Sequence, residues 1–163
     1  GHPNHHPKQR DLIARLCHNP YLSYLICGTY GVGKTTYGML LYRKALEEGR
    51  PAVAITLIEL LQQMRDFKSE PIITPEIVRE NKEQQFIFID EFGKAGGRIT
   101  EFASGGLHAL IQACEEWNAQ LVITANKNKE QLSEYWSQAD PEYGPSIMRK
   151  ILQKKGAFYV DLF

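Results

Sequence analysis

The sequence predicts an α/β fold in which one parallel sheet of five short strands is covered by helices on both faces. Residues 86–89 are apolar at every position, and residues 121–125 repeat that signature, as expected of strands buried on both sides. Three further short strands are expected, and segments with apolar residues at helical spacing lie between the strands. Because strands alternate with helices along the chain, the strands are expected to pair in parallel.

Local start and stop signals set the expected boundaries of the elements. Gly49 and Pro51 end the helix that begins at Gly33, and Thr56 with Glu59 has capping-box spacing. Strands are expected over residues 21–27, 52–56, 86–89, 121–125 and 157–162. Helices are expected over residues 8–17, 33–48, from 57 to 65, through the apolar stripe 107–117, over 129–136 and over 146–154. The segment 66–85 is polar, with one further helix start at 74–76.

Length and composition exclude several classes of protein. The chain has 163 residues, which suits one domain, and its 19 Lys and Arg balance 19 Asp and Glu. A generally basic nucleic-acid coat is therefore excluded, and contact with DNA or RNA would need a local patch. No apolar run approaches the roughly 20 residues of a membrane span. The start lacks the apolar stretch of a secretory signal, and three widely spaced cysteines indicate reduced thiols in a cytoplasmic protein.

A glycine-rich segment, residues 28–35, matches G-x-x-x-x-G-K-[ST] between a predicted strand and a predicted helix. Its glycines let successive backbone N–H groups point at phosphate oxygens, and the helix N-terminus favours the anion. Lys34 is expected to reach the β- and γ-phosphates, and the Thr35 hydroxyl to bind Mg²⁺. The expected ligands are ATP or ADP with Mg²⁺, held by Gly28, Thr29, Tyr30, Gly31, Val32, Gly33, Lys34, Thr35 and Thr36. We call residues 28–35 the phosphate loop.

Polar residues follow two of the buried strands. Asp90 and Glu91 come after residues 86–89, where Asp90 would hold the metal ion and Glu91 would polarise the attacking water. The alternative for this pair is two solvated acids at a strand end. Asn126 follows the strand 121–125 and could orient the water or touch the γ-phosphate, although Asn is also a common turn residue.

Basic residues supply two further candidates. Arg149, or its neighbour Lys150, lies on a predicted helix and could stabilise transition-state charge at the nucleotide of a neighbouring subunit. The alternative is a basic helix face, which Lys154 continues. The segment 94–98 is a basic loop after the two acids, suited either to the phosphates of a single strand or to a mobile surface loop. His108 is interpreted as a residue of the helix surface.

Taken in order, these motifs resemble AAA+ ATPases, and within them bacterial and phage helicase loaders of the DnaC type and IstB-type transposition helpers. The resemblance covers residues 21–163 and rests on segments 28–35, 52–65, 87–91 and 124–126 and on the region of Arg149. It implies a Walker A loop, a Walker B pair (Asp90, Glu91), a sensor 1 residue (Asn126) and an arginine finger (Arg149). It also implies a sheet of order 5-1-4-3-2 and nucleotide sites shared between subunits.

The same resemblance implies a function and partners. We expect an ATPase of DNA replication that loads a helicase, switching its hold on a replicative helicase and single-stranded DNA, or a transposase in the alternative. Residues 1–20 are expected to be an N-terminal arm with a short helix, partly tag or flexible chain. Residues 21–163 are expected to be the ATPase core without a C-terminal lid or an Arg of the sensor 2 type.

Two other functions are compatible with the phosphate loop. A small-molecule kinase would leave Asp90, Glu91 and Asn126 unexplained and would need an Arg-rich lid, where only Arg98 lies near. An interaction module could use ATP as an assembly ligand without hydrolysing it. If the protein is an ATPase whose sites are shared between subunits, an isolated monomer lacks the cation of its neighbour and is expected to hydrolyse ATP slowly.

Overall fold

The computed structural model describes residues 7–65 and 70–163. The first six residues of the expected arm and residues 66–69 of the polar segment lie outside the described part. The five strands are β1 (Ser23–Cys27), β2 (Ala52–Thr56), β3 (Phe86–Asp90), β4 (Gln120–Ala125) and β5 (Ala157–Asp161). They form one parallel sheet of order β2-β3-β4-β1-β5, so the predicted fold and strand order are confirmed.

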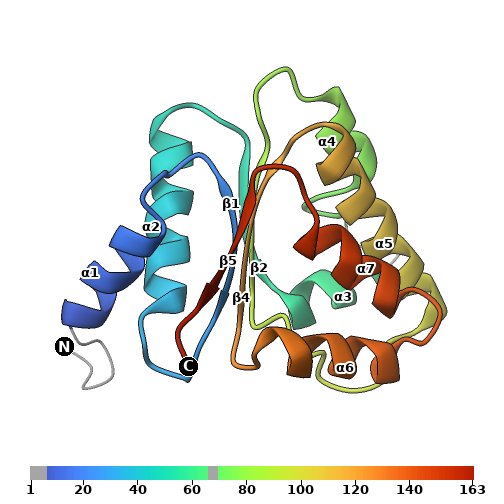
Figure 1. Ribbon diagram of the computed structural model, residues 1–163. Helices are drawn as coiled ribbons and strands as arrows, with labels where there is room; N and C mark the ends of the chain where they lie inside the picture. Colours follow the sequence, from blue (N-terminus) through green and yellow to red (C-terminus); the bar gives the residue numbers. More distant parts are fainter. Residues whose placement is uncertain (1–6, 66–69) are drawn as a thin grey trace.

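Helices cover both faces of the sheet, as predicted. They are α1 (Pro7–Leu16), α2 (Lys34–Glu47), α3 (Leu57–Arg65), α4 (Pro75–Glu80), α5 (Glu101–Glu116), α6 (Lys129–Ala139) and α7 (Gly144–Leu152). In Figure 1, α1 and α2 lie on one side of the sheet, and α3, α4, α5 and α7 lie on the other. The helix α6 lies below the sheet, at the edge where the strands end. No helix in the described ranges is long and apolar enough to cross a membrane.

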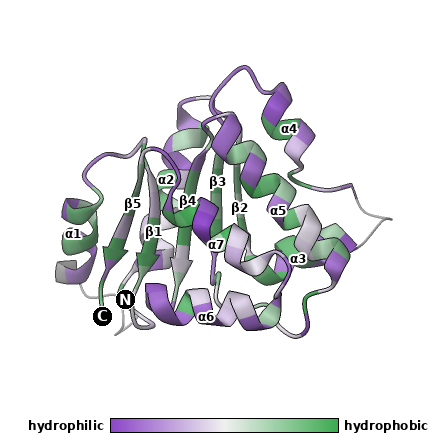
Figure 2. Cartoon of the chain, turned by 45° about the vertical axis from the view of Figure 1, so that its right-hand side comes forward, coloured by the Kyte–Doolittle hydropathy of each residue, from purple (hydrophilic) through white to green (hydrophobic). Residues whose placement is uncertain are grey.

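Alternating side chains of the central strands build a separate core on each face. Phe86 and Phe88 of β3 pack with the α1 and α2 side, whereas Ile87 and Ile89 pack with the α3, α5 and α7 side. All four are at most 1% exposed. Figure 2 shows the apolar strands inside and the polar residues on the outer faces of the helices. A strand apolar at every position is therefore required here, because both of its faces are covered.

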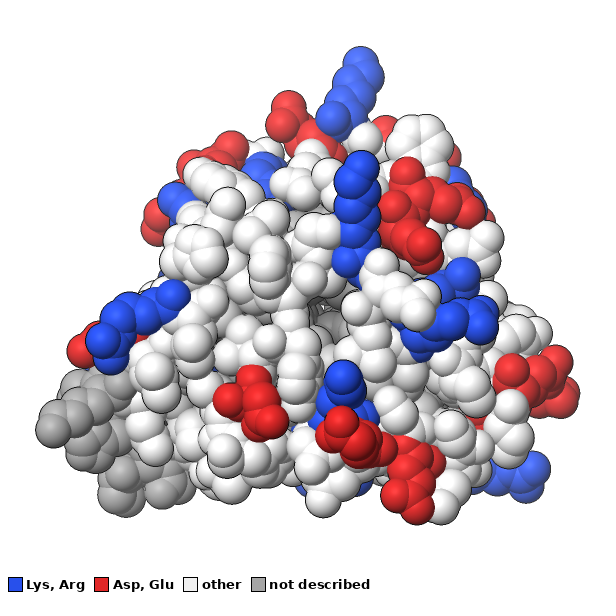
Figure 3. All heavy atoms as spheres, viewed as in Figure 1, with Lys and Arg blue, Asp and Glu red and all other residues white. Residues whose placement is uncertain are grey.

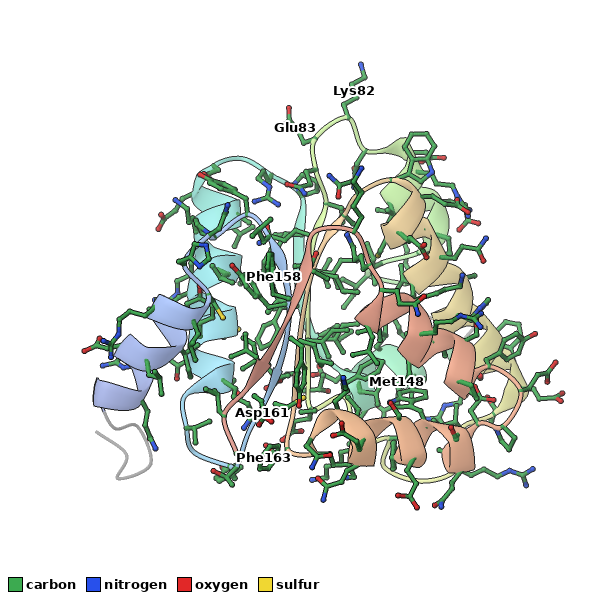
Figure 4. The ribbon with its side chains drawn as sticks, viewed as in Figure 1. Lys82, Glu83, Met148, Phe158, Asp161 and Phe163 are labelled. Atoms are coloured by element: carbon green, nitrogen blue, oxygen red, sulfur yellow. The ribbon has the colours of Figure 1, made fainter. Side chains whose placement is uncertain are left out.

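The strand β5 closes the sheet at the edge away from β2. It pairs with β1 along its length, and Phe158 and Tyr159 remain 49% and 36% exposed. Phe158, Asp161 and Phe163 are labelled in Figure 4, and the chain runs along them to the edge at which the strands end. There the backbone N–H of Leu162 donates to the carbonyl of Cys27 at 2.7 Å. Figure 3, in the same view, shows charges of both signs around the rim and an uncharged central area.

The helix predicted around the apolar stripe 107–117 differs from the observed one at both ends. The helix α5 starts at Glu101, where the Thr100 side chain caps the N–H of Ala103. Gly105 and Gly106 lower the helix propensity of its first turns, which hid this start in the sequence. Trp117 does not continue the apolar stripe: it lies at the C-cap and is 55% exposed.

Gly38 allows α2 to approach the sheet closely. A Cβ atom at this position would lie 2.3–2.6 Å from three ring atoms of Phe88, which real Cβ contacts do not show. The Phe88 ring is fully buried against α2 and cannot move away into solvent. The absence of a side chain at Gly38 thus sets the distance between the helix and β3.

We predict opposite effects for two helical glycines. Gly38→Ala should lower the free energy of unfolding by about 1–3 kcal/mol, because the added methyl group overlaps the Phe88 ring. Gly105→Ala, whose Cβ would meet Tyr143 only at 3.8 Å or beyond, should raise it by about 0.5–1 kcal/mol through helix propensity. Urea unfolding of both variants measures this, and a neutral Gly38→Ala would contradict the close packing.

Candidate functional site

The register of the sheet brings the ends of β1, β3 and β4 together. Cys27 pairs with Ala125, and Ile123 pairs with Ile89, so the residues that follow these positions meet at one edge. A cavity of about 520 Å³ opens there. It is lined by Tyr30, Gly31, Gly33, Lys34, Thr35, Thr36, Met39, Leu40, Arg43, Asp90, Glu91, Thr124, Ala125 and Asn126. The predicted phosphate loop, acid pair and Asn126 therefore share one cavity.

The phosphate loop curls around the N-terminus of α2. Gly31 and Gly33 have φ of 87° and 96°, a backbone conformation that side-chain-bearing residues rarely adopt. Gly33 is the N-cap of α2 and provides no side chain to satisfy the first N–H groups of the helix. A helix start with unpaired N–H groups and a partial positive charge attracts an anion.

Lys34 is buried inside the curl of the loop. Only 6% of the residue is exposed, and its Nζ atom donates to the carbonyls of Gly28 at 2.9 Å and Thr29 at 2.7 Å. Burial lowers the pKa of Lys34, and the nearby Asp90 carboxylate acts in the opposite direction. An ammonium group held by two neutral carbonyls is poorly solvated, so an anion entering the cavity would be strongly attracted to it.

Asp90 joins the phosphate loop to the two central strands. The Thr35 hydroxyl lies 3.0 and 3.2 Å from the two carboxylate oxygens of Asp90, and the Thr124 hydroxyl also donates to this carboxylate. Thr35 belongs to α2, Asp90 to β3 and Thr124 to β4. Three elements that are far apart in the sequence are thus connected through one side chain.

The chain turns sharply out of the strand conformation at Glu91, directly after the end of β3. The φ of Glu91 is +57°, and its backbone N–H donates to the Thr124 hydroxyl at 3.2 Å. The next N–H, of Phe92, donates to the Thr124 carbonyl at 2.9 Å. This sharp turn puts Glu91 among the residues that line the cavity, beside Asp90 rather than beyond it.

The segment after Glu91 is fixed by α6 and the turn before it. The Trp136 indole N–H donates to the carbonyl of Phe92 at 3.1 Å, and Lys127 donates to that of Gly93 at 2.9 Å. The Tyr135 hydroxyl accepts the N–H of Ala95 at 2.9 Å. The loop 94–98 is therefore hydrogen bonded to α6 at its start.

Asn126 and Tyr30 lie at the rim of the cavity. Asn126 is the first residue after β4 and is exposed toward the opening. Tyr30 is 76% exposed, also at the opening. Their placement is compatible with contact to a bound molecule.

Arg149 and Lys150 are not brought to this cavity. Both belong to α7, which packs against α5 and α6 on the side of the sheet away from α2. Lys150 lies 3.8 Å from Glu115 in an ion pair, whereas Arg149 is exposed. His108, interpreted as surface, is half-buried instead, with its Nε2 atom 2.9 Å from the Ser146 hydroxyl of α7.

Sequence reasoning missed five residues that line the cavity, namely Met39, Leu40, Arg43, Thr124 and Ala125. Met39, Leu40 and Arg43 follow Thr36 at helical spacing on the exposed side of α2. In the sequence this spacing indicates one face of a helix, and the structure shows that this face lines the cavity. Thr124 carried a signal, since it is a polar residue in an otherwise apolar strand and is 1% exposed. A hydroxyl in such a place needs a partner, and here it has two.

A glycine loop at a helix N-terminus, with a Lys-Thr pair beside the acid of a neighbouring strand end, defines the class of P-loop nucleotide-binding proteins. The sequence profile of the ATPase family associated with various cellular activities (AAA) matches residues 24–140. This match covers more than half of the chain, which therefore belongs to the AAA family. No curated protein matches it by sequence.

Solved structures similar to the chain come from replication proteins. The DnaC helicase loader has a TM-score of 0.60 and 14% identity, over 94% of this chain and 86% of that one. The DnaI structure has a TM-score of 0.64 and 15% identity, over 87% of this chain and 70% of that one. AMPPCP-bound DnaA from Aquifex aeolicus has a TM-score of 0.63 and 15% identity, over 99% of this chain and 47% of the DnaA chain. This chain therefore spans about half the length of that DnaA chain.

At these identities the likeness concerns the fold alone. It confirms the expected similarity to helicase loaders at that level, while the likeness to transposition helpers stays a prediction. The AMPPCP in the DnaA structure shows that a neighbour of this fold binds a nucleotide.

We predict that the conformation of Gly33 matters for nucleotide binding. Gly33→Ala and Gly156→Ala both place a methyl group at positive φ, 96° and 74°, and each should cost about 1–2 kcal/mol of stability. Only Gly33→Ala should weaken binding of a fluorescent ADP analogue, by about tenfold or more, because Gly156 is remote from the cavity. Equal affinities of the two variants would contradict the role of the loop.

Proposed function

We propose that the protein binds ATP with Mg²⁺ in this cavity and hydrolyses it. The observation that carries the proposal is the contact between the Thr35 hydroxyl and the Asp90 carboxylate at 3.0 Å, at the N-terminus of α2 in an AAA chain. It joins the loop suited to phosphates with the acid suited to the metal ion. The family match favours this function over a small-molecule kinase.

In this proposal, the phosphate loop and Lys34 hold the β- and γ-phosphates. The ammonium group of Lys34 donates to two backbone carbonyls, and charged phosphate oxygens are stronger acceptors than these. Gly28, Thr29, Tyr30, Gly31, Val32, Gly33 and Thr36 complete the proposed nucleotide contacts.

The donors present suit Mg²⁺. Thr35 and Asp90 supply hard oxygen atoms, and Mg²⁺ is usually held by one or two such protein groups together with substrate phosphates. Among residues 7–65 and 70–163, no group of three or more His, Cys, Asp and Glu is placed to hold a metal ion by itself. When bound, Mg²⁺ neutralises charge that develops on the phosphate oxygens.

Glu91 and Asn126 are proposed to act on the attacking water. Glu91 lines the cavity beside Asp90, so its carboxylate can accept a proton from water directed at the γ-phosphate. Asn126, at the end of the adjacent strand, can orient that water or contact the γ-phosphate.

Arg149 is proposed to complete the site of a second copy of the chain. It does not line its own cavity and is exposed on α7, so its guanidinium is accessible to a neighbour. The ion pair of Lys150 with Glu115 favours Arg149 over Lys150 for this role. Hydrolysis would then depend on assembly.

The partners proposed are a replicative helicase and single-stranded DNA. Support comes from the fold likeness to DnaC and DnaI and from the basic loop, in which Lys94 and Arg98 are exposed. This loop begins three residues after Glu91, so that bound nucleotide and bound DNA would contact neighbouring parts of one segment. The nucleotide state would thereby alter the hold on the partners.

Two variants test the shared site. Glu91→Gln should bind ATP but not hydrolyse it, and Arg149→Ala should lower the ATPase rate by about 10³-fold or more. Mixing the two inactive variants should restore part of the activity, because the glutamine variant donates its Arg149 to an intact site. The measurement is phosphate release against protein concentration.

Lys150→Ala is the matched control for loss of a cation on α7. It removes the ion pair with Glu115 and should leave the ATPase rate near that of the unaltered protein. A rate per subunit that is high and independent of concentration, or mixing without recovery, would contradict a site shared between subunits.

The partners are tested by nucleotide-dependent binding. Fluorescence anisotropy of a labelled oligonucleotide and capture of a purified replicative helicase should both differ between ADP and a non-hydrolysable ATP analogue. Replacing Lys94 and Arg98 by Ala should weaken oligonucleotide binding and reduce its salt dependence. Absence of helicase binding in both nucleotide states would contradict the loader function.

A further inference from the structure

We propose that Thr124 is a positioning residue that holds Asp90 and Glu91 in one arrangement for the metal-bound nucleotide. The inference rests on the proposed function and deepens it. Thr124 does not bind the metal ion or the nucleotide in this proposal. Its hydroxyl contacts the side chain of Asp90 and the backbone N–H of Glu91, and it acts through these two acids.

The hydrogen bonds of Thr124 leave its hydroxyl no freedom. A hydroxyl has one hydrogen, and that of Thr124 is donated to the Asp90 carboxylate. Its oxygen therefore accepts the Glu91 N–H at 3.2 Å. Thr124 is 1% exposed, so its hydroxyl is largely shielded from solvent.

The backbone of Thr124 reinforces the same turn. The Thr124 carbonyl accepts the N–H of Phe92 at 2.9 Å, and the Thr124 hydroxyl accepts the N–H of Glu91. Two consecutive backbone N–H groups therefore donate to the same residue. Glu91 has a φ of +57°, which costs about 1–2 kcal/mol for a residue with a side chain. Such a conformation persists only where neighbouring contacts impose it, and Thr124 supplies the two contacts on either side of the strained residue.

Asp90 is held from two directions. Thr35 approaches its carboxylate from the phosphate loop and Thr124 approaches it from β4. If Thr35 turns its hydroxyl toward a metal ion, the Thr124 hydroxyl still fixes the carboxylate. Loss of the Thr124 hydroxyl would remove one of the two contacts to the Asp90 carboxylate and the contact to the Glu91 N–H.

The test compares variants of Thr124 by two measurements. Thr124→Val keeps the shape and removes the hydroxyl, and Thr124→Ser keeps the hydroxyl. With a fluorescent ADP analogue, Thr124→Val should bind normally in EDTA but need about 10- to 100-fold more Mg²⁺ for the magnesium-dependent change in affinity. Its kcat should fall by a similar factor with less effect on KM, and Thr124→Ser should restore both.

Thr100→Val is the control for loss of a threonine hydroxyl elsewhere. It removes the N-cap of α5 and should cost stability, measured by urea unfolding, without changing the Mg²⁺ requirement. If Thr124→Val does not fold, Thr124→Cys gives the same comparison, since a thiol is a weak donor and acceptor.

The outcomes separate this inference from the proposed function. An unchanged Mg²⁺ requirement in Thr124→Val, or a serine variant as defective as the valine variant, overturns the positioning role. Failure of the unaltered protein to bind nucleotide in either condition overturns the proposed function itself, and the positioning role with it.

Discussion

The hydrogen-bonded register of β1, β4 and β3 is the constraint on which the site depends. The end of β1 leads into the phosphate loop, the end of β3 carries Asp90, and β4 lies between them. Shifting one strand by a single residue would exchange the side chains that pack into the two cores and displace its polar end. The two apolar cores therefore fix the register, and the register fixes the distances within the site.

The cores also set the electrostatic surroundings of the polar residues. Cys27 and Ile89 at the ends of β1 and β3, and Ala125 in the cavity lining, are at most 1% exposed, so the polar residues that follow them adjoin a buried apolar core. Burial lowers the pKa of Lys34 and raises that of Cys27 to about 12. In such surroundings an interaction between opposite charges is stronger than in water, and the buried hydroxyl and ammonium groups are each hydrogen bonded.

Local sequence patterns were sufficient for the sheet and for most of the cavity. The apolar run 86–89 and the glycine spacing of the phosphate loop each report a local requirement, namely burial on both faces and a curled backbone. Those requirements can be recognised without knowing any distant contact. Asp90 and Glu91 could be placed as well, because parallel strands end at a common edge.

Features that depend on distant contacts could not be predicted in the same way. The start of α5 was hidden by two glycines, and Trp117 kept helical spacing although the helix had ended. Nothing in the loop 94–98 indicates that Tyr135, forty residues further on, binds its backbone. Thr124 is similar: its polarity was visible, but its partners on β3 depend on the pairing of two strands.

The helix α6 shows why these distant contacts matter for the site. Asn126 stands just before it, and Lys127, Tyr135 and Trp136 hold the backbone that follows Glu91. Phe92 stacks on Trp136 with ring centroids 4.7 Å apart, and both rings are fully buried. The two strand ends that face the phosphate loop are therefore supported by one packed unit, and neither can shift without disturbing the support of the other.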